Sequence, residues 1–312
     1  MGGQDKNLGW SADEYAKLVG FSGDWRDTWW HQDYLELLAR RLDLGAATSL
    51  LDVGCGVGHW GQRLATVMRS DLEVVGVDHE AGFLDAARER AAGRPGRFTY
   101  QQSEGETLPF GDGRFDVVTC QTVLIHVADA RAVLREMLRV TRPGGVVLLS
   151  EPNNLVDSIS NRLALHGPGD EMLARLFAFE ATCIAGRARL GAGDAIVGER
   201  LGAYLHELGA EAVRIWTGDT CATLHPPYDA PASRLHVEAL RSWAGQGVGH
   251  FGTRERTRAF YLAGGGDEAA FEPLWQAGLA SLRDVVAAID RGDFRTAGGF
   301  MMYVVAGRKP TV

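Results

Sequence analysis

Cysteine is scarce in this chain, and the few cysteines do not form a cluster. The 312 residues include four cysteines, which stand far apart and form no C-x-x-C motif: Cys55, Cys120, Cys183 and Cys221. This spacing argues against a disulfide framework and against a zinc centre, so we expect no metal site. Cysteines without a pairing pattern also fit a reducing compartment such as the cytoplasm.

Long apolar runs and runs of basic residues are lacking as well. The opening residues, MGGQDKNLGW, are polar, and no stretch of 18 apolar residues follows them. We therefore expect neither a signal peptide nor a membrane-spanning helix, and no membrane as a partner. The formal net charge of −8 argues against a nucleic-acid partner, because phosphate binding needs a basic face. Together these absences predict a soluble protein of the cytoplasm.

What the chain does contain is a regular alternation of apolar runs and helical patterns. The apolar runs predict five strands, at 48–54, 72–78, 97–104, 114–123 and 145–152. The helical patterns predict three helices, at 59–68, 81–93 and 129–140. Asp129 is the expected N-cap of the last helix. Strands and helices that alternate at this spacing predict an α/β fold whose parallel sheet is covered on both faces.

The alternation breaks after Pro152, and this break suggests how the chain is divided. The expected segments are an N-terminal helical lid at 1–45, a sheet core at 46–152, a helical insertion serving as an acceptor lid at 153–193, a return to the core at 194–219, a second mainly helical insertion at 220–297, and the last core strand at 298–312. In the second insertion, Leu274 to Ile289 share a helix face. That face is a candidate for pairing two copies of the chain in a homodimer.

The stretch LDVGCGVGHWG, residues 51–61, places a glycine-rich loop directly after the first strand. Such a loop lets a ligand lie against the backbone, and alone it fits a dinucleotide and S-adenosylmethionine (SAM) about equally. Asp78 ends the second strand at about twenty residues beyond the loop. A carboxylate there can accept hydrogen bonds from both ribose hydroxyls, which both cofactors contain.

Four motifs, taken in order, separate these alternatives. They are LDVGCGVGHWG, VVGVDHE, QQSEGETLPFGDGRFDVVTCQTVLIHV and MLRVTRPGGVVLLSEP. With them the chain resembles class I SAM-dependent methyltransferases, in particular their bacterial small-molecule branch. The resemblance covers 46–152, and more loosely 194–219 and 298–307. It implies a Rossmann-like class I methyltransferase sheet, mostly parallel with an antiparallel last strand, covered by helices and carrying helical lid insertions.

The resemblance also implies SAM as the cofactor and assigns residues to its methionine portion. Gly54 and Gly56 would let the backbone approach this portion, and Asp52 would orient its ammonium group. Asp52 could instead merely cap the loop. SAM has no phosphate, and the sequence between Leu51 and Gln62 contains no arginine or lysine.

The nucleoside portion of SAM is assigned in the same way. Asp78 would hold the ribose. Glu104 and Gly105 stand where the family places an acidic and a small residue beside the adenine, often Asp-Ala. Gln121, at the end of the fourth strand, would line the methyl-donor pocket.

Residues for the methyl acceptor are less defined by the sequence. His126 follows the fourth strand and is a candidate general base, because the pKa of histidine suits that role; packing or loop geometry is the alternative. Glu151 and Asn153 follow the fifth strand and could contact the acceptor or cap the turn. Trp29 and Trp30 could line an aromatic acceptor pocket or seal helices onto the sheet.

The sequence therefore predicts an enzyme that moves a methyl group from SAM to a small organic acceptor, for example a secondary metabolite, by in-line displacement. One alternative is a SAM-binding enzyme that does not methylate, such as a cyclase. A lesser alternative is an NAD-dependent oxidoreductase. The motifs report cofactor binding, so they leave the acceptor open.

Overall fold

The structure, a computed structural model, describes residues 24–156 and 169–311. These residues fall into two compact units. Of the described residues, the sheet unit contains 29–152, 197–219 and 302–311, and the helical unit contains 24–28, 153–156, 169–196 and 220–301. Each unit is considered by itself below.

Seven strands form the single sheet of the sheet unit. They are β1 (Ser49–Val53), β2 (Glu73–Asp78), β3 (Arg97–Gln102), β4 (Phe115–Gln121), β5 (Thr141–Pro152), β6 (Glu211–Thr217) and β7 (Met302–Arg308). Their order is β3-β2-β1-β4-β5-β7-β6, and β7 runs antiparallel to both of its neighbours. The prediction of a mostly parallel sheet with an inserted antiparallel last strand is confirmed.

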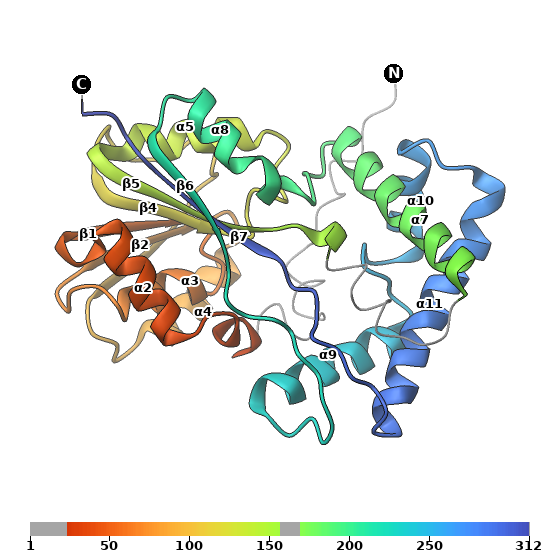
Figure 1. Cartoon of the computed structure of the whole chain (residues 1–312). Helices are drawn as coiled ribbons and strands as arrows, with labels where there is room; N and C mark the ends of the chain where they lie inside the picture. The colour runs from red at the N-terminus through yellow and green to blue at the C-terminus, as the bar shows by residue number, and fades with distance from the viewer. Residues whose placement is uncertain (1–23, 157–168, 312) are drawn as a thin grey trace. The chain divides into compact units, whose positions relative to one another are not determined.

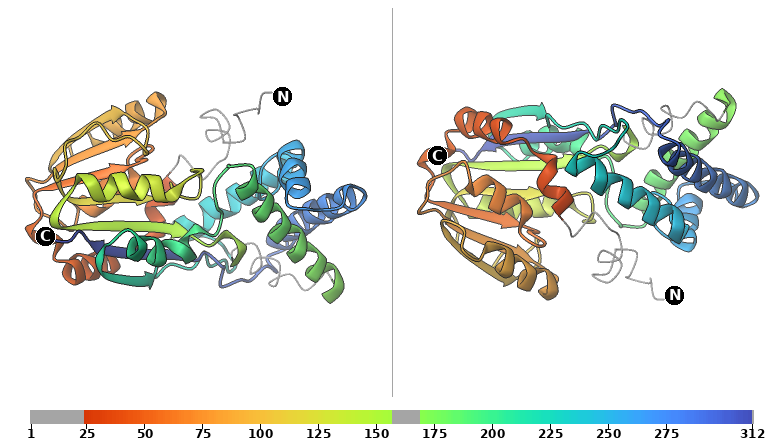
Figure 2. Two further views of the ribbon diagram at one scale, coloured as in Figure 1. Left: turned by 90° about the horizontal axis from the view of Figure 1, so that it is seen from above. Right: turned by 90° about the horizontal axis from the view of Figure 1, so that it is seen from below.

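Helices cover both faces of this sheet (Figure 1). One face packs against α5 (Ala130–Val140) and α8 (Leu201–Glu207). The other faces α2 (Gln32–Leu42), α3 (His59–Ala65) and α4 (Ala81–Ala91), and Figure 2 shows the unit from above and from below. The described residues also form three short 3-10 helices: η1 (Asp24–Trp29), η2 (Leu44–Ala46) and η3 (Val197–Arg200).

Local sequence explains why these elements form. All five residues of β1 are buried, as expected for a central parallel strand covered on both faces. The Asp129 side chain accepts a hydrogen bond from the Ala132 backbone N–H at 3.1 Å, so the predicted N-cap of α5 is confirmed. From this start, α5 turns Val133, Leu134 and Met137 into the core.

The N-terminal segment differs from the lid expected over 1–45. Residues 1–23 of that lid lie outside the described residues, whereas α2 belongs to the sheet unit. Two hydrogen bonds fix α2 to the last strands: the Tyr34 hydroxyl donates to the Thr217 carbonyl at 2.8 Å, and Arg308 donates to the Leu42 carbonyl at 2.9 Å. Side-chain partners so distant in sequence cannot be inferred from the helical pattern alone.

The helical unit contains four long helices in its described part. They are α7 (Asp170–Arg189), α9 (Pro231–Gln246), α10 (Arg254–Ala263) and α11 (Glu268–Asp290). The backbones of α7 and α10 approach so closely that a Cβ added to Gly186 would lie 1.7 Å from the Phe260 carbonyl oxygen. Glycine is therefore required at this helix crossing.

The face of α11 predicted to pair two copies of the chain is occupied inside the chain. Leu274 packs in one aromatic-rich cluster of the helical unit, and Val285 and Ile289 pack in a second cluster. Because these side chains are buried, this face is not available to a second copy. The correction concerns the face, and the homodimer itself stays a prediction.

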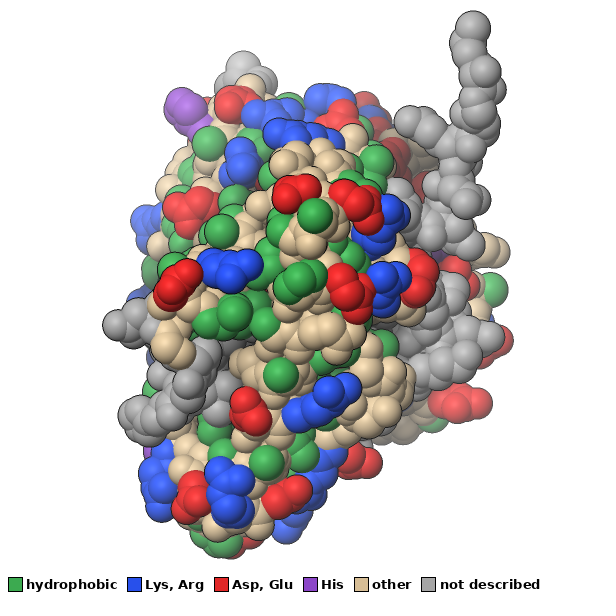
Figure 3. Space-filling model, turned by 90° about the vertical axis from the view of Figure 1, so that its right-hand side faces the viewer, with side chains coloured by type: hydrophobic (Ala, Val, Ile, Leu, Met, Phe, Trp, Pro, Cys, Tyr) green, Lys and Arg blue, Asp and Glu red, His purple; other side chains and the backbone are tan. Residues whose placement is uncertain are grey.

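The surface of the helical unit mixes charges of both signs. Figure 3 shows acidic and basic side chains interspersed over the described residues of one face. Two ion pairs join α10 to α11, Arg254 with Glu272 at 2.6 Å and Arg258 with Glu268 at 2.5 Å. Within the residues that the structure describes, none of the helices is both long and apolar enough to cross a membrane.

Candidate cofactor site

The glycine-rich loop leaves β1 at the carboxyl edge of the sheet. Gly54, Gly56 and Gly58 adopt left-handed conformations, with φ of 65°, 51° and 84°. Space also excludes a side chain at Gly54, because an added Cβ would lie 2.4 Å from Cγ2 of Val123. At Gly56, such a Cβ would meet no atom of the described residues within 4 Å beyond its chain neighbours. The loop therefore offers bare backbone to a ligand at Gly56.

Two further glycines serve the packing of α3. A Cβ on Gly58 would lie 2.5 Å from Nε2 of Gln62 and 3.0 Å from the Tyr100 hydroxyl. A Cβ on Gly61 would lie 2.9 Å from Oδ2 of Asp52. These contacts explain why the stretch carries more glycines than a ligand alone would require.

The two carboxylate oxygens of Asp52 differ in their hydrogen bonding. Oδ2 accepts a hydrogen bond from the Gly61 N–H at 2.9 Å. Oδ1 is buried and has no hydrogen-bond partner among the described residues. Burial raises the pKa of Asp52 to about 7 and outweighs the opposing hydrogen bond from Gly61. A cation beside Oδ1 would stabilise the ionised carboxylate, so capping the loop and orienting an ammonium group are compatible roles.

Asp78 ties the glycine-rich loop to the end of β2. Its Oδ2 accepts a hydrogen bond from the Gly56 N–H at 2.8 Å, and its Oδ1 accepts one from the Glu80 N–H at 3.0 Å. His79 Nδ1 lies 3.4 Å from Oδ1. A carboxylate has about four acceptor positions, so these bonds leave capacity for ribose hydroxyls.

Gln121 ends β4, the strand beside β1. Its side chain is buried, and Nε2 has no hydrogen-bond partner within the described part of the chain. Asp52 pairs with Thr119 in the sheet, and Gln121 follows two residues later, so both side chains extend from the same face. An acceptor without a partner and a donor without a partner therefore occur on one face at the carboxyl edge.

Glu104 and Gly105 follow β3 at the same edge. The preceding residue, Ser103, donates its backbone N–H to the Asp78 carbonyl at 3.0 Å. Gly105 lies against the last residue of β1, since an added Cβ would be 3.6 Å from Cγ1 of Val53. Glu104 is exposed. The structure thus brings this pair to the end of β1, and its role beside the adenine stays a prediction.

Glu151 is fully buried near the end of β5 and binds the loop that follows β4. Its Oε1 accepts hydrogen bonds from the N–H groups of Val123 and Leu124 at 2.8 and 2.9 Å, and its Oε2 accepts one from Ile125 at 3.3 Å. Burial raises the pKa of Glu151 to about 7, although these hydrogen bonds oppose the rise. This geometry favours turn capping over contact with an acceptor.

The loop held by Glu151 forms one wall of the glycine turn, a contact that no sequence motif indicates. Val123 is the residue that excludes a side chain at Gly54. Thr122 beside it has a left-handed backbone, with φ of 53°, which is strained for a threonine. Neither residue type has a motif, so only the fold identifies this wall.

The two remaining polar candidates lie in different units. His126 is half-buried in the loop after β4, and its backbone N–H donates to the Val123 carbonyl at 2.9 Å. Asn153 belongs to the helical unit, and its side-chain oxygen accepts a hydrogen bond from the Val156 N–H at 3.4 Å, which favours a capping role. Their roles toward an acceptor stay predictions.

Trp29 and Trp30 are both buried. The Trp30 ring lies 5.8 Å from that of Tyr34 in α2 and 4.9 Å from that of Trp60 in α3, measured between centroids. Trp60 in turn donates its indole N–H to the Thr119 hydroxyl at 2.7 Å. For Trp30 these contacts favour the alternative that the rings seal helices onto the sheet.

The residues present fit SAM. The ligand carries an ammonium group for the Asp52 oxygen, ribose hydroxyls for Asp78, and acceptor groups for the Gln121 amide, and it needs an open backbone such as that at Gly56. Within residues 24–156 and 169–311, no group of three or more potential metal ligands occurs. The reversed strand β7 and the carboxylate-bound glycine loop together define a class I, Rossmann-like methyltransferase fold.

Comparison with known proteins makes the assignment more specific. Residues 51–149 match the family model described as a methyltransferase domain. The demethylmenaquinone methyltransferase of Shouchella clausii is 34% identical over 122 residues, which are 39% of this chain and 52% of that protein. The methyltransferase GfsG of Streptomyces halstedii is 36% identical over 118 residues, 37% of this chain and 42% of that protein.

A solved structure agrees in fold over most of the chain. The phosphoethanolamine N-methyltransferase 2 of Haemonchus contortus, in complex with phosphomonomethylethanolamine and S-adenosylhomocysteine (SAH), superimposes with a TM-score of 0.50 and 18% identity. The match covers 96% of this chain and 59% of that one. The chain spans about half the length of the two sequence relatives named above.

Proposed function

We propose that this protein transfers the methyl group of SAM to a small organic acceptor by in-line displacement. One observation carries the proposal. On one face of the sheet, at the carboxyl ends of β1 and β4, the buried Asp52 Oδ1 and Gln121 Nε2 lack partners among the described residues, and the open turn at Gly56 directly follows β1. The name of one relative, which refers to demethylmenaquinone, supports a small molecule as the acceptor.

SAM supplies a methyl carbon made electrophilic by a positively charged sulfur. In this chain, Asp52 would orient the ammonium group of SAM, and Asp78 would accept hydrogen bonds from its ribose hydroxyls. Glu104 and Gly105 would flank its adenine. Gln121 lines the methyl-donor pocket. Holding donor and acceptor in line can lower the barrier by about 7–11 kcal/mol, so positioning is the main contribution of the protein.

His126 is proposed as the general base for an acceptor with a hydroxyl group. It lies in the loop that Glu151 holds by three backbone hydrogen bonds, so its backbone is firmly placed. An amine acceptor would not require this proton transfer to the same degree. The composition and the charge support a soluble cytoplasmic enzyme as part of the proposal.

Binding and turnover should be measured separately. Calorimetry with SAM and SAH tests binding, and formation of SAH in the presence of a panel of hydroxyl, amine and carbon acceptors tests transfer. Asp78→Asn should weaken SAH binding by about tenfold or more, because it replaces a charged acceptor. Asp85→Asn is the matched control, since Asp85 is exposed on α4 and pairs with Arg88 at 2.5 Å.

The outcomes separate the alternatives. Acceptor-dependent SAH formation supports methyl transfer. Binding of SAM without SAH formation for any acceptor would indicate a non-methylating enzyme such as a cyclase. Binding of NAD in place of SAM would indicate an oxidoreductase, and absence of SAM and SAH binding would overturn the proposal.

A further inference from the structure

A small hollow lies on the sheet unit, away from the glycine-rich loop. Its volume is about 130 Å³, and three of the eight residues that line it are arginines, Arg41, Arg214 and Arg308. Arg308 at the end of β7 pairs with Val146, and Val146 pairs with Val117 near the start of β4. The hollow is therefore at the amino edge of the parallel strands, opposite the edge where the cofactor loop begins.

Local structure explains why a hollow forms there. The helix α2 ends at Leu42, because the next residue, Asp43, turns into a left-handed conformation with φ of 56°. On β6, a bulge between Glu211 and Arg214 displaces the strand, and Ala212 within it has φ of 49°. Small side chains such as Ala306 leave the space between the strands and the helix end unfilled.

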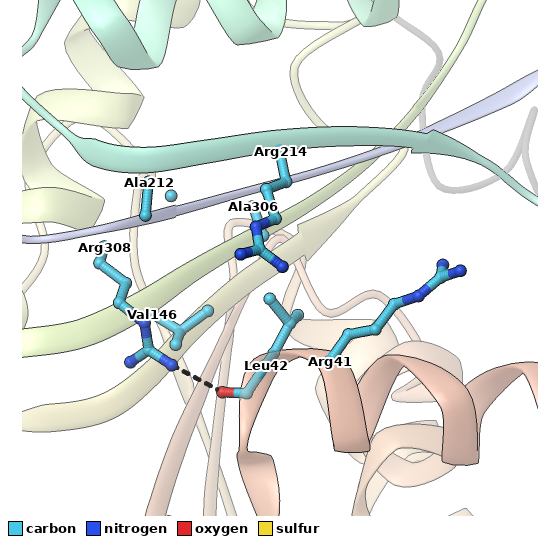
Figure 4. Close-up of a pocket in the computed structure, with 8 residues that line it drawn as sticks. Arg41, Leu42, Val146, Ala212, Arg214, Ala306 and Arg308 are labelled. Carbon is cyan, nitrogen blue, oxygen red and sulfur yellow. Dashed lines mark hydrogen bonds between the residues drawn. The ribbon is translucent and has the colours of Figure 1, made fainter.

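The arginines bring positive charge into this hollow without acidic partners. Figure 4 shows the guanidinium groups of Arg214 and Arg308 directed into the same space. Arg308 is held there by two backbone oxygens, those of Gly144 and Leu42, each at 2.9 Å. Among the described residues, neither arginine forms an ion pair with a carboxylate, and Glu211, the strand partner of Arg308, forms none either.

The remaining arginine adds to the same field. The guanidinium of Arg41 lies 5.2 Å from the centroid of the Trp216 ring, a contact that leaves its charge in place. The end of α2 offers about half a negative charge through its last carbonyl groups. This compensates only part of the positive charge that the three arginines bring to the lining.

We propose that this hollow binds a small oxyanion of the phosphate class. The bound anion would bridge the end of α2 and the β6–β7 edge of the sheet. Guanidinium groups present paired N–H donors that match the oxygens of such an anion. The size of the hollow favours one phosphate group over an extended polyanion, and the net charge of −8 on the whole chain opposes a polyanion as well. The site is independent of the proposed methyl transfer.

The test uses the full chain without SAM, titrated with inorganic phosphate at constant pH and ionic strength. Calorimetry and the unfolding temperature should both report saturable binding. Arg214→Ala should weaken it by about tenfold or more, because a charged hydrogen-bonding group is removed. Arg214 is exposed, so its loss should leave the fold intact, and unchanged SAH affinity would verify this.

Arg40→Ala is the matched control, because Arg40 is an exposed arginine in the same last turn of α2 that does not line the hollow. It should bind phosphate like the wild type. Glycerol 3-phosphate in a second titration distinguishes the source of the ligand: tighter binding indicates a phosphate monoester, and equal binding indicates free phosphate. Lack of saturable binding of both, or equal weakening by the two substitutions, would overturn the proposal.

Discussion

Replacing Glu151 by glutamine tests how a buried carboxylate serves the cofactor site. The carboxylate accepts three backbone hydrogen bonds from residues 123–125. Glutamine can keep the two short bonds with its single carbonyl oxygen. Its NH2 group then faces the Ile125 N–H, and because both groups are hydrogen-bond donors, the bond from Ile125 is lost. The variant therefore loses one support of the loop while it also loses a buried charge.

The effect on stability follows from the pKa. Burial raises the pKa of Glu151 from the ordinary 4.5 to about 7, so the folded protein holds this proton more tightly than the unfolded chain. Stability from this group is then complete below pH 4.5 and is lost as the pH rises toward about 7. At about 1.4 kcal/mol for each unit of pKa, the loss amounts to roughly 3 kcal/mol. Glutamine does not ionise, so Glu151→Gln should avoid this loss.

The assay is urea unfolding of the wild type and Glu151→Gln across this pH range. Between pH 4.5 and pH 8, the unfolding free energy of the wild type should fall by about 3 kcal/mol relative to that of the variant. SAH affinity at pH 8 should nevertheless fall by about tenfold, because the loop beside Gly54 loses a charged hydrogen bond. Glu106→Gln, at an exposed glutamate, is the control. A difference that stays constant with pH, or a stabler variant with unchanged SAH affinity, would refute the reasoning.

Three further predictions concern the same unit. Wild-type SAH affinity should rise about tenfold or more from pH 5 to pH 8, because the ammonium group needs ionised Asp52; calorimetry of Asp52→Asn should show a flat profile, and a flat wild type would contradict this. Gly54→Ala should lower the unfolding free energy by about 2–3 kcal/mol, because the added methyl group would collide with Val123. Gly56→Ala should lower it by only about 1 kcal/mol but should weaken SAH binding more than Gly54→Ala does. Equal destabilisation by the two substitutions would count against Gly56 as the position where the ligand meets the backbone. Hydrogen bonds from the 48–49 segment and the Arg142 guanidinium hold the pKa of Asp116 well below its ordinary 3.8, so Asp116→Asn should destabilise the protein at pH 7 in urea unfolding. The difference from the wild type should shrink as the pH falls below 3.8, and a difference that stays constant there would exclude this cause.

Residue patterns along the chain predict much of the fold. The five predicted strands in 46–152 occur as β1 to β5, and the N-cap of α5 is at Asp129. The glycine-rich loop and Asp78, chosen from spacing alone, are joined by a hydrogen bond of 2.8 Å. Such features depend on neighbours close in sequence, on backbone conformations that favour glycine, and on the alternation of buried and exposed positions.

Other assignments depended on partners that the sequence does not reveal. Glu151 was a candidate for the acceptor, yet its carboxylate binds backbone groups 26–28 residues away. Trp30, a candidate for an acceptor pocket, is enclosed by Tyr34 and Trp60. Leu274, a candidate for a dimer face, lies in the core of the helical unit.

The sequence by itself thus determined the order of strands and helices, the conformation of the glycine turn and the class of cofactor. Only the tertiary structure decided which polar side chains keep an open hydrogen-bonding position, as Asp52 and Gln121 do, and which are used within the fold, as Glu151 is. The physical reason is that conformation and periodicity are local properties of the chain. Burial and hydrogen-bond satisfaction depend instead on segments that meet only after folding.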